Sequence, residues 1–168
     1  MRRLEPLSRA HDREGFDCGS EPLNRFLKQT ARQHAERGIS RTFVLVDSEV
    51  SEPKPILGYF SLTLCQVKPG TLSPADSRKL PDQTFGILLG RLAVAKELQG
   101  QGIGKALMGA ALEKFITIFN AAGGIGLFVD AQDENAKRFY EGFGFLPLPS
   151  NPLQLFLPVK TIQSALDG

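Results

Sequence analysis

Cysteine is scarce in this sequence, since Cys18 and Cys65 are the only two among 168 residues. Two cysteines that lie so far apart provide neither the disulfide framework of a small secreted domain nor the spacing of a zinc site. We therefore expect both thiols to be reduced, the protein to be intracellular, and no metal to be bound.

The net charge and the apolar runs are also small. The balance of 20 Lys and Arg against 18 Asp and Glu leaves +2 at pH 7, so attraction for nucleic acid has to come from local patches. The charged stretch 1–6 lacks the apolar segment of a signal peptide. No apolar run reaches the roughly 18 residues of a membrane helix. These absences predict a cytoplasmic protein that does not enter the membrane.

The length and the hydrophobic periodicity predict a single domain over residues 1–168, with an α/β (α+β) fold and a mixed sheet. A helix is expected between Ser20 and Gly38, because Leu23, Phe26 and Ala31 repeat at helical spacing. After it, runs of β-forming residues alternate with helical patterns. We expect strands over 42–46, 56–64, 84–94 and 126–130, helices from 103 onward and over 133–141, and a closing hairpin of 143–148 with 153–159.

The stretch 92–107 is the most informative part of the chain. Glycine stands at the alternate positions 100, 102 and 104, between an apolar strand and a helix. Glycines let a backbone approach a ligand closely, and the unpaired N–H groups and positive dipole end of a helix favour an anion. The sequence therefore predicts a pyrophosphate site, to which Lys105 in the first helical turn adds a positive charge.

Two common phosphate loops are excluded by the residues around these glycines. A P-loop needs G-x-x-x-x-G-K-[ST], but Gln99 and Ala106 occupy its first and last positions. A dinucleotide fingerprint needs G-x-G-x-x-G, but Lys105 or Leu107 stands at its last glycine. The remaining pattern, Q-x-x-G-x-G after a strand that ends in Leu-Ala-Val, resembles the acetyl-CoA-binding motif of the GNAT N-acetyltransferases.

The resemblance implies the GNAT fold, a mixed central sheet of about six or seven strands flanked by helices, whose splayed central strands hold acetyl-CoA. In that family the backbone of the strand before the loop pairs with the pantetheine arm, and the loop amides take the pyrophosphate. Carried over, this assigns to acetyl-CoA the strand residues Leu92, Ala93 and Val94 and the loop and helix residues Gln99, Gly100, Gln101, Gly102, Ile103, Gly104 and Lys105.

A second motif, from Asp133 to Phe145, resembles the GNAT pattern N-x-x-A-x-x-F-Y-x-x-x-G-F and carries Tyr140 at its tyrosine. When an amine attacks the thioester a thiolate leaves, and a phenol with a pKa of about 10 is a suitable proton donor to it. We expect Tyr140 to be the general acid; the alternative is a core aromatic with a hydrogen-bonded hydroxyl. Because Asp133 replaces the usual asparagine, Asp133 and Asn135 are both candidates for its coenzyme contact.

A general base is not evident. Of the only two histidines, His34 falls on the apolar side of the first helix and His11 lies in a charged segment without an assignable role. A lysine amine, with a pKa of about 10.4, needs a base near neutral pH, whereas an α-amino group, with a pKa of about 8, is already partly neutral. The missing base favours an α-amine as acceptor.

Two further residues have structural expectations. We expect Cys18 to be buried, and Tyr59 to pack in the core or to line the substrate side.

The segment 11–27 narrows the resemblance. It looks like the motif F-x-C-G-x-x-x-L-[DN]-x-F-L of the TacT/AtaT-type GNAT toxins, with Phe16 and Cys18 at its start and Asn24 at its [DN] position. The resemblance covers nearly the whole chain, with one departure at Ala95-Lys96, where an Asp is expected. It implies a toxin of a type II toxin–antitoxin system that acetylates the α-amino group of aminoacyl-tRNA and blocks translation. It also implies a homodimer and a ribbon-helix-helix antitoxin.

Basic residues supply local charge that suits tRNA. Between positions 24 and 41, five Lys and Arg stand against one Glu, a balance of +4. Such groups bind phosphates, although each taken singly is as readily part of a solvated helix face. The candidates are Arg25, Lys28, Arg32, Arg78, Lys79 and Arg91. Two alternatives stay open: a GNAT enzyme that acetylates a small amine or a protein N-terminus, and a non-catalytic acetyl-CoA-binding module.

Overall fold

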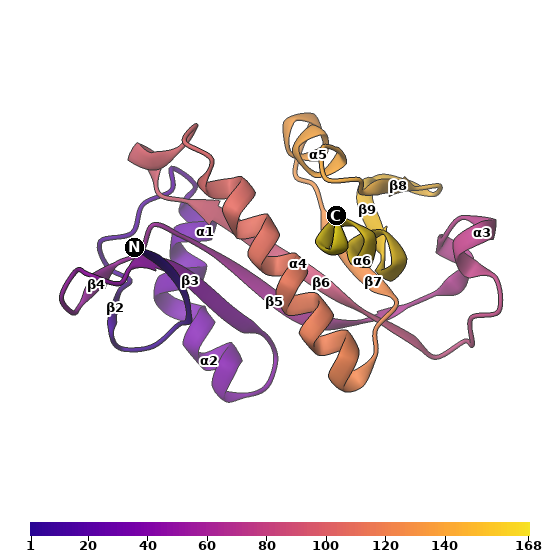
Figure 1. Cartoon of the computed structure of the whole chain (residues 1–168), viewed down its shortest axis with the longest axis horizontal. Coiled ribbons are helices and arrows are strands. Elements are labelled where there is room, and N and C mark those ends of the chain that lie inside the picture. The colour runs from indigo at the N-terminus through magenta and orange to yellow at the C-terminus, as the bar shows by residue number, and fades with distance from the viewer. The chain divides into compact units, whose positions relative to one another are not determined.

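The computed structural model describes residues 1–168, with helices and strands along the whole chain (Figure 1). Seven strands follow the order β1-β3-β5-β6-β7-β9-β8 in one mixed sheet, and β2 and β4 form a separate pair. This confirms the predicted α/β class and strand number. The chain divides into two compact units: Met1–Thr63 with Gly90–Ala111, and Leu64–Leu89 with Leu112–Gly168. We call them the first and the second unit.

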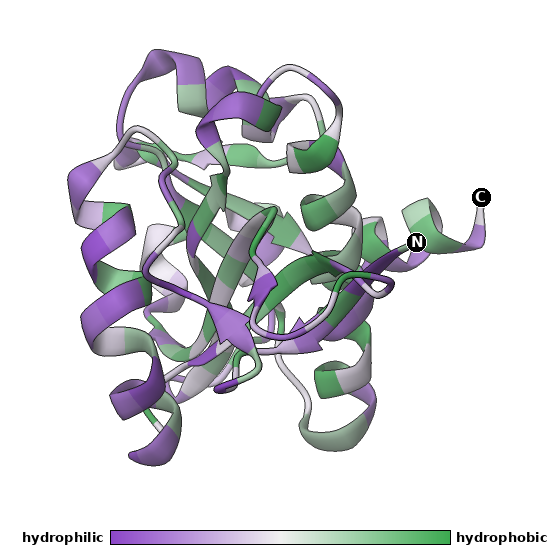
Figure 2. Ribbon diagram, turned by 90° about the vertical axis from the view of Figure 1, so that its left-hand side faces the viewer, coloured by the Kyte–Doolittle hydropathy of each residue, from purple (hydrophilic) through white to green (hydrophobic).

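Three elements continue from one unit into the other: the strands β5 (Gly58–Val67) and β6 (Thr84–Val94) and the helix α4 (Ile103–Ala122). The bounds of β6 and the start of α4 are those expected from the sequence. Residues of both strands and of the α4 face that includes Leu107 are buried, and the strands of the sheet are largely hydrophobic in Figure 2.

The first unit is built on the antiparallel strands β1 (Arg2–Pro6), β3 (Arg41–Asp47) and the beginning of β5, which lie side by side in Figure 1. The β3–β5 pairing confirms the expected strand pair. The edge strand β1 was not predicted, because it is charged and only partly buried and so shows no apolar alternation. The short strands β2 (His11–Asp12) and β4 (Lys54–Pro55) pair in parallel beside it.

The expected helix between Ser20 and Gly38 consists of α1 (Glu21–Arg25), a π-helical turn (Phe26–Thr30) and α2 (Ala31–Glu36). It packs on β3 and β5 in a core cluster that includes Phe26, Leu27 and Ala31 from the helix and Val44, Val46 and Tyr59 from the strands. The apolar spacing predicted the helix but not its π-helical turn. Gly38 follows its end at φ +72°, a conformation that favours glycine.

In the second unit, β7 (Gly126–Asp130) pairs in parallel with β6 and antiparallel with β9 (Asn151–Pro158), and β8 (Leu146–Leu148) pairs with β9. The closing hairpin is thereby confirmed, but its first strand starts at residue 146 because residues 143 and 144 form the turn after the helix α5 (Glu134–Glu141).

Two further helices of this unit were not predicted. The one-turn helix α3 (Pro74–Ser77) lies between β5 and β6, where no helix was expected. The helix α6 (Val159–Asp167) buries only Ile162, and a single buried residue gives too weak an apolar pattern to predict a helix. None of the helices combines the length and the apolar character that a membrane crossing requires.

Gly126 offers a test of the packing between β7 and β9. A Cβ atom there would overlap the carbonyl oxygen of Leu157 and lie 2.5 Å from Cε1 of Phe156. We expect Gly126→Ala to lower the free energy of unfolding by about 1 to 3 kcal/mol, the usual result of overpacking, as measured by urea denaturation.

The matched control is Gly109→Ala in α4, where an added Cβ meets nothing within 4 Å. That substitution should raise the stability by about 0.4 to 1 kcal/mol, because alanine restricts the unfolded chain. Equal effects of the two substitutions would contradict the close β7–β9 approach.

Candidate functional site

The glycine loop of the first unit owes two of its glycines to backbone conformation. Gly100 and Gly102 adopt φ +82° and +85°, in the left-handed region that other residues avoid. A Cβ at either position would meet no atom within 4 Å. It is therefore the alternating left-handed backbone, and not crowding within the protein, that requires glycine here.

The helix α4 begins directly after this loop. The N–H of Ala106 donates a hydrogen bond to the carbonyl of Gly102, the residue directly before the helix. The N–H groups of Ile103, Gly104 and Lys105 precede that bond and have no intrahelical acceptor, as in the first turn of any helix. Together with the exposed Lys105 side chain, they make this end of α4 suited to a doubly charged anion such as a pyrophosphate.

The Gln99 side chain holds the loop in place. Its Nε2 donates to the carbonyl of Val94 at the end of β6 (3.1 Å) and to the carbonyl of Cys18, 81 residues away (2.9 Å). The backbone N–H of Lys96 adds a bond to the carbonyl of Asp17 (2.7 Å). The start of the loop is thereby attached to the N-terminal segment.

Asn24 in turn fixes that segment. Its buried side chain accepts from the N–H of Cys18 (2.9 Å) and donates to the Asp17 carboxylate (2.9 Å). The N-terminal motif thus supports the loop through its cysteine backbone, which sequence reasoning did not anticipate. The Cys18 thiol is buried, as expected, and burial raises its pKa, which disfavours the thiolate needed for nucleophilic catalysis.

The strand residues before the loop lie at the end of β6. Ala93 is buried, whereas Leu92 and Val94 are partly exposed. The β6–β7 register runs from Ile87 to Leu89, and β6 continues five residues beyond the last of these pairs to Val94.

The basic candidates fall in both units. Arg25 is exposed and Lys28 and Arg32 half-buried along the first helix, while Arg91 on β6 stacks its guanidinium 3.6 Å above the Phe26 ring. These four belong to the first unit. Arg78 and Lys79 are exposed in the turn after α3 and belong to the second unit.

Tyr140 lies on α5 in the second unit. Its ring packs edge-on against Phe139 and Phe145, at centroid distances of 5.4 and 5.7 Å. Burial raises the pKa of its phenol, and the nearby negative charge of Asp130 raises it further. Within its unit the hydroxyl has no hydrogen-bond partner, in contrast to Tyr59, whose buried hydroxyl donates to the Leu23 carbonyl (2.7 Å). Tyr140 therefore stays protonated and able to donate at neutral pH, and Tyr59 is a packing residue.

Asp133 and Asn135 make bonds within their own helix. Asp133 is the N-cap of α5 and accepts from the N–H of Ala136 (2.8 Å), while Asn135 accepts from the Arg138 guanidinium. The aspartate in place of the usual asparagine is thus a good helix cap.

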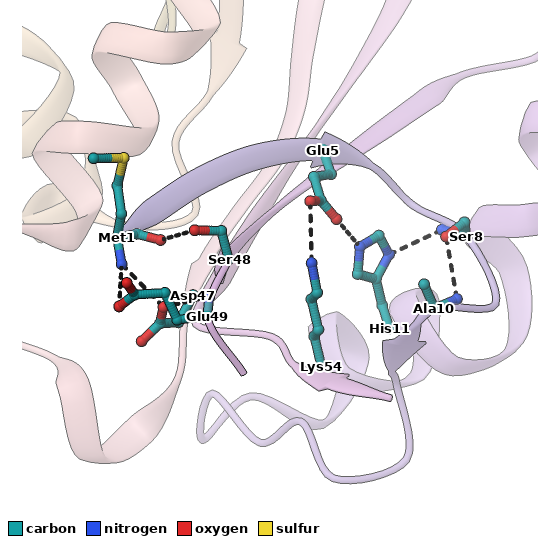
Figure 3. A network of polar contacts seen from close by, with 9 residues as sticks. All are labelled: Met1, Glu5, Ser8, Ala10, His11, Asp47, Ser48, Glu49 and Lys54. Carbon is teal, nitrogen blue, oxygen red and sulfur yellow. Dashed lines mark hydrogen bonds and ion pairs between the residues drawn. The ribbon is translucent and has the colours of Figure 1, made fainter. Parts of the chain in front are cut away.

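Neither histidine is placed to act as a base. His11 is buried; its Nδ1 accepts from the N–H of Ser8 (3.0 Å), so its Nε2 carries the proton and donates to Glu5 (2.7 Å), which also faces Lys54 (Figure 3). His34 pairs with the Ser40 hydroxyl and packs edge-on against Phe26. No group of three or more His, Cys, Asp or Glu side chains is arranged to hold a metal ion.

Sequence reasoning missed a pocket of about 250 Å³ in the second unit, and with it Asp130. Asp130 is the last residue of β7 and lines this pocket. The sequence could have indicated Asp130, because this residue ends a strand of a parallel pair and α/β folds commonly bind ligands at the carboxyl ends of such strands.

Comparison with known proteins agrees with this geometry. A family model described as an acetyltransferase (GNAT) domain matches residues 56–147. A tRNA-acetylating toxin of Mycobacterium tuberculosis is 29% identical over 95% of this chain and 93% of its own length. A crystal structure of a Tyr-to-Phe variant of KacT is 34% identical, with a TM-score of 0.89 over 98% of both chains. AtaT complexed with acetyl-methionyl-tRNAfMet is 33% identical, with a TM-score of 0.89 over 99% of both chains.

A glycine loop on a helix N-terminus in a mixed seven-stranded sheet, together with these similarities, defines the class of protein. The chain belongs to the GNAT acetyltransferase family and is an N-acetyltransferase. It resembles the toxin members of that family over its whole length.

The His11–Glu5 contact offers a test of its structural role. The hydrogen bond from His11, and then the charge of Lys54, lower the pKa of Glu5. The ionised Glu5 carboxylate therefore stabilises the fold fully above the unfolded-state pKa of about 4.3. This stabilisation is lost as the pH falls through the lower pKa that Glu5 has in the folded protein. We expect Glu5→Gln to reduce the free energy of unfolding at pH 7 by about 1 to 2 kcal/mol, and the difference from the wild type to vanish in acid.

Glu49→Gln is the matched control, because Glu49 is 82% exposed where it pairs with the Met1 amine. Its effect should stay below about 0.5 kcal/mol. Chemical denaturation of both variants between pH 3 and pH 8 measures the difference. A loss for Glu5→Gln that is independent of pH would contradict the assignment.

Proposed function

We propose that this chain is a toxin that transfers the acetyl group of acetyl-CoA to the α-amino group of aminoacyl-tRNA and so blocks peptide-bond formation. One observation carries the proposal: the similarity to a tRNA-acetylating toxin and to AtaT extends beyond residues 56–147 to the N-terminal segment. That segment supports the glycine loop and carries three of the basic candidates. The substrate would place the protein's action in the cytoplasm.

Acetyl-CoA supplies an activated acetyl thioester. The residues assigned to it are the backbone of Leu92 to Val94 for the pantetheine arm and the loop amides from Gln99 to Gly104 for the pyrophosphate. The left-handed glycines and the unpaired N–H groups at the start of α4 support this assignment. A solved structure of AtaTR is bound to acetyl-CoA. Asp133 and Asn135, which make bonds within α5, would contact the coenzyme only through their remaining polar atoms.

The transfer forms a C–N bond and breaks the C–S bond of the thioester. The nitrogen lone pair attacks the carbonyl carbon, and the sulfur leaves as a thiolate that needs a proton. Tyr140 is the residue that we assign as the donor, because its raised pKa keeps the phenol protonated at the pH where an α-amine becomes neutral. Tyr-to-Phe variants of the relatives KacT and AtaT have been solved.

An α-amino acceptor is consistent with the lack of a base. His11 and His34 are both committed to structural hydrogen bonds, so neither imidazole is available to deprotonate a lysine amine. An α-amine with a pKa of about 8 needs none near neutral pH.

The tRNA and the protein partners follow from the same similarity. We assign the RNA backbone to Arg25, Lys28, Arg32 and Arg91, with Arg78 and Lys79 as further candidates. AtaT has been solved bound to the C-terminus of the antitoxin AtaR. We infer that this chain is likewise neutralised by an antitoxin, of ribbon-helix-helix type, and acts as a homodimer. Acetylation of a small amine is the second candidate, favoured by the Asp130 carboxylate in its pocket.

Tyr140→Phe tests the general acid. We expect the rate of label transfer from acetyl-CoA to a pool of charged tRNAs to fall by about 10²- to 10⁴-fold, the usual contribution of a general acid. The fold should be preserved, since the ring contacts with Phe139 and Phe145 remain. Uncharged tRNA should receive no label.

Tyr59→Phe is the control, because Tyr59 is the only other tyrosine and its hydroxyl donates a hydrogen bond to the Leu23 carbonyl. It should lower thermal stability and leave the rate within about 3-fold. If charged tRNA receives no label while a small amine does, the toxin assignment is wrong.

Gly102→Ala tests the loop. Alanine at φ +85° is strained by roughly 1 to 2 kcal/mol, which corresponds to about a 10-fold weaker affinity for acetyl-CoA when the loop relaxes to relieve it. Isothermal titration calorimetry measures the dissociation constant. The control is Gly70→Ala, at an open position without positive φ, which should leave the dissociation constant unchanged. If Gly102→Ala binds acetyl-CoA as tightly as the wild type, the loop is not part of the coenzyme site.

A further inference from the structure

Two consecutive peptide groups of the N-terminal segment hold the start of the glycine loop through their carbonyl ends. The carbonyl of Asp17 accepts from the N–H of Lys96 (2.7 Å). The carbonyl of Cys18 accepts from Nε2 of Gln99 (2.9 Å). These bonds reach the first residue of the 3₁₀ turn Lys96–Leu98 and the residue that follows it. The turn that leads from β6 to the glycines is therefore fixed at both of its ends.

The N–H ends of the same two peptide groups are bonded as well. The N–H of Cys18 shares a peptide group with the Asp17 carbonyl, and it donates to Oδ1 of Asn24 (2.9 Å). The N–H of Gly19 shares a peptide group with the Cys18 carbonyl, and it donates to Oδ1 of Asp17 (2.8 Å). Each peptide group is thus bonded at both ends, and hydrogen bonds that are linked in this way polarise and strengthen one another.

The side chain of Asn24 takes part in both sets of bonds. Its Nδ2 donates to the same Asp17 oxygen that accepts from Gly19 (2.9 Å). The hydrogen bond from Asn24, and then that from Gly19, lowers the pKa of Asp17, and the positive charges of Lys96 and Lys28 act in the same direction. Asn24 is only 5% exposed. A buried amide is unfavourable unless it is hydrogen-bonded, and here both of its ends bond to the turn of residues 17–19.

We propose that Asn24 is a positioning residue for acetyl-CoA: by fixing the turn of residues 17–19 it fixes the entry to the glycine loop, and it thereby sets the affinity for a coenzyme that it does not touch. The inference rests on the coenzyme site of the proposed function. A loop that is ordered beforehand loses less conformational freedom when it binds a pyrophosphate. The pyrophosphate is held alike in the ground state and in the transition state, so Asn24 acts on affinity and not on the rate at saturation.

Asn24→Ala tests the inference, because it removes the bonds to the Cys18 N–H and to the Asp17 carboxylate together. We expect the dissociation constant for acetyl-CoA, measured by isothermal titration calorimetry, to rise by about 10-fold, since two hydrogen bonds are lost. KM for acetyl-CoA should rise in parallel, while kcat at saturating coenzyme with charged tRNA stays within about 3-fold of the wild type. An unchanged dissociation constant, or a loss confined to kcat, would overturn the inference.

Val46→Ala is the matched control for a general loss of stability. Val46 is fully buried on β3 in the core cluster of the same unit and makes no bond to the turn of residues 17–19. Its truncation destabilises the fold by loss of packing and should leave the dissociation constant for acetyl-CoA unchanged. If Val46→Ala weakens coenzyme binding as much as Asn24→Ala does, the effect of Asn24 is general destabilisation and the inference is wrong.

Gln99→Ala breaks the same connection from the side of the loop. Gln99 is exposed, so this variant decides the question if Asn24→Ala does not fold, and it should raise the dissociation constant by a similar factor. The double variant should bind about as weakly as the weaker of the two single variants, because both act through the turn of residues 17–19. Effects that multiply in the double variant would show two independent contributions and contradict the inference.

Asn24→Asp adds a pH signature that a general loss of packing would lack. Its carboxylate still accepts from the Cys18 N–H, but a second oxygen now faces the Asp17 carboxylate in place of the amide donor. Two carboxylates so close raise the pKa of one of them, so the pair takes up a proton as the pH falls and regains the hydrogen bond. The ratio of the variant to the wild-type dissociation constant should therefore decrease from pH 8 to pH 5.5, whereas the ratio for Asn24→Ala stays constant.

The same titrations separate the inference from the proposed function. A ratio for Asn24→Asp that does not change with pH would contradict the role of the Asn24–Asp17 bond. If the wild type binds acetyl-CoA and acetylates charged tRNA while the Asn24 variants bind equally well, only the inference fails. A wild-type protein that binds no acetyl-CoA would instead reject the proposed function.

Discussion

The Gln99 amide is the contact on which the arrangement of the loop depends. By donating to both Val94 and Cys18 it joins the end of β6 to a segment 81 residues earlier in the sequence. The left-handed glycines after it then lead the backbone into α4 with the first-turn N–H groups unpaired. Glycine loses more conformational freedom on ordering than any other residue, so a loop with several glycines needs such contacts at its ends.

The N-terminal segment has a structural meaning that its motif does not reveal. Asn24 holds the Asp17–Cys18 backbone, and that backbone holds Lys96 and Gln99. The cysteine takes part through its peptide carbonyl and nitrogen, and its thiol is inert. A residue that looks reactive in the sequence therefore supports the loop through its backbone, while the buried His11 and Tyr59 are held by hydrogen bonds to Glu5 and Leu23.

Most of the elements were predictable from sequence, because local patterns define them. The strands at 84–94 and 126–130 and the start of α4 at 103 have the bounds that periodicity and glycines indicate. The edge strand β1, the π-helical turn and α6 were not, since a charged edge, a one-residue change of helical winding and a single buried Ile162 leave no periodic signal.

The sequence alone determined the family, because the spacing of glycines after a strand and before a helix is a local property. It also led to the roles that we propose for the loop and for Tyr140. Only the tertiary structure decided which polar side chains are committed elsewhere and which line a pocket. His11 is bonded to Glu5, and Asp130 lines a pocket of the second unit. Such pairings join residues that are distant in the chain, and they depend on strand register and packing that no local pattern encodes.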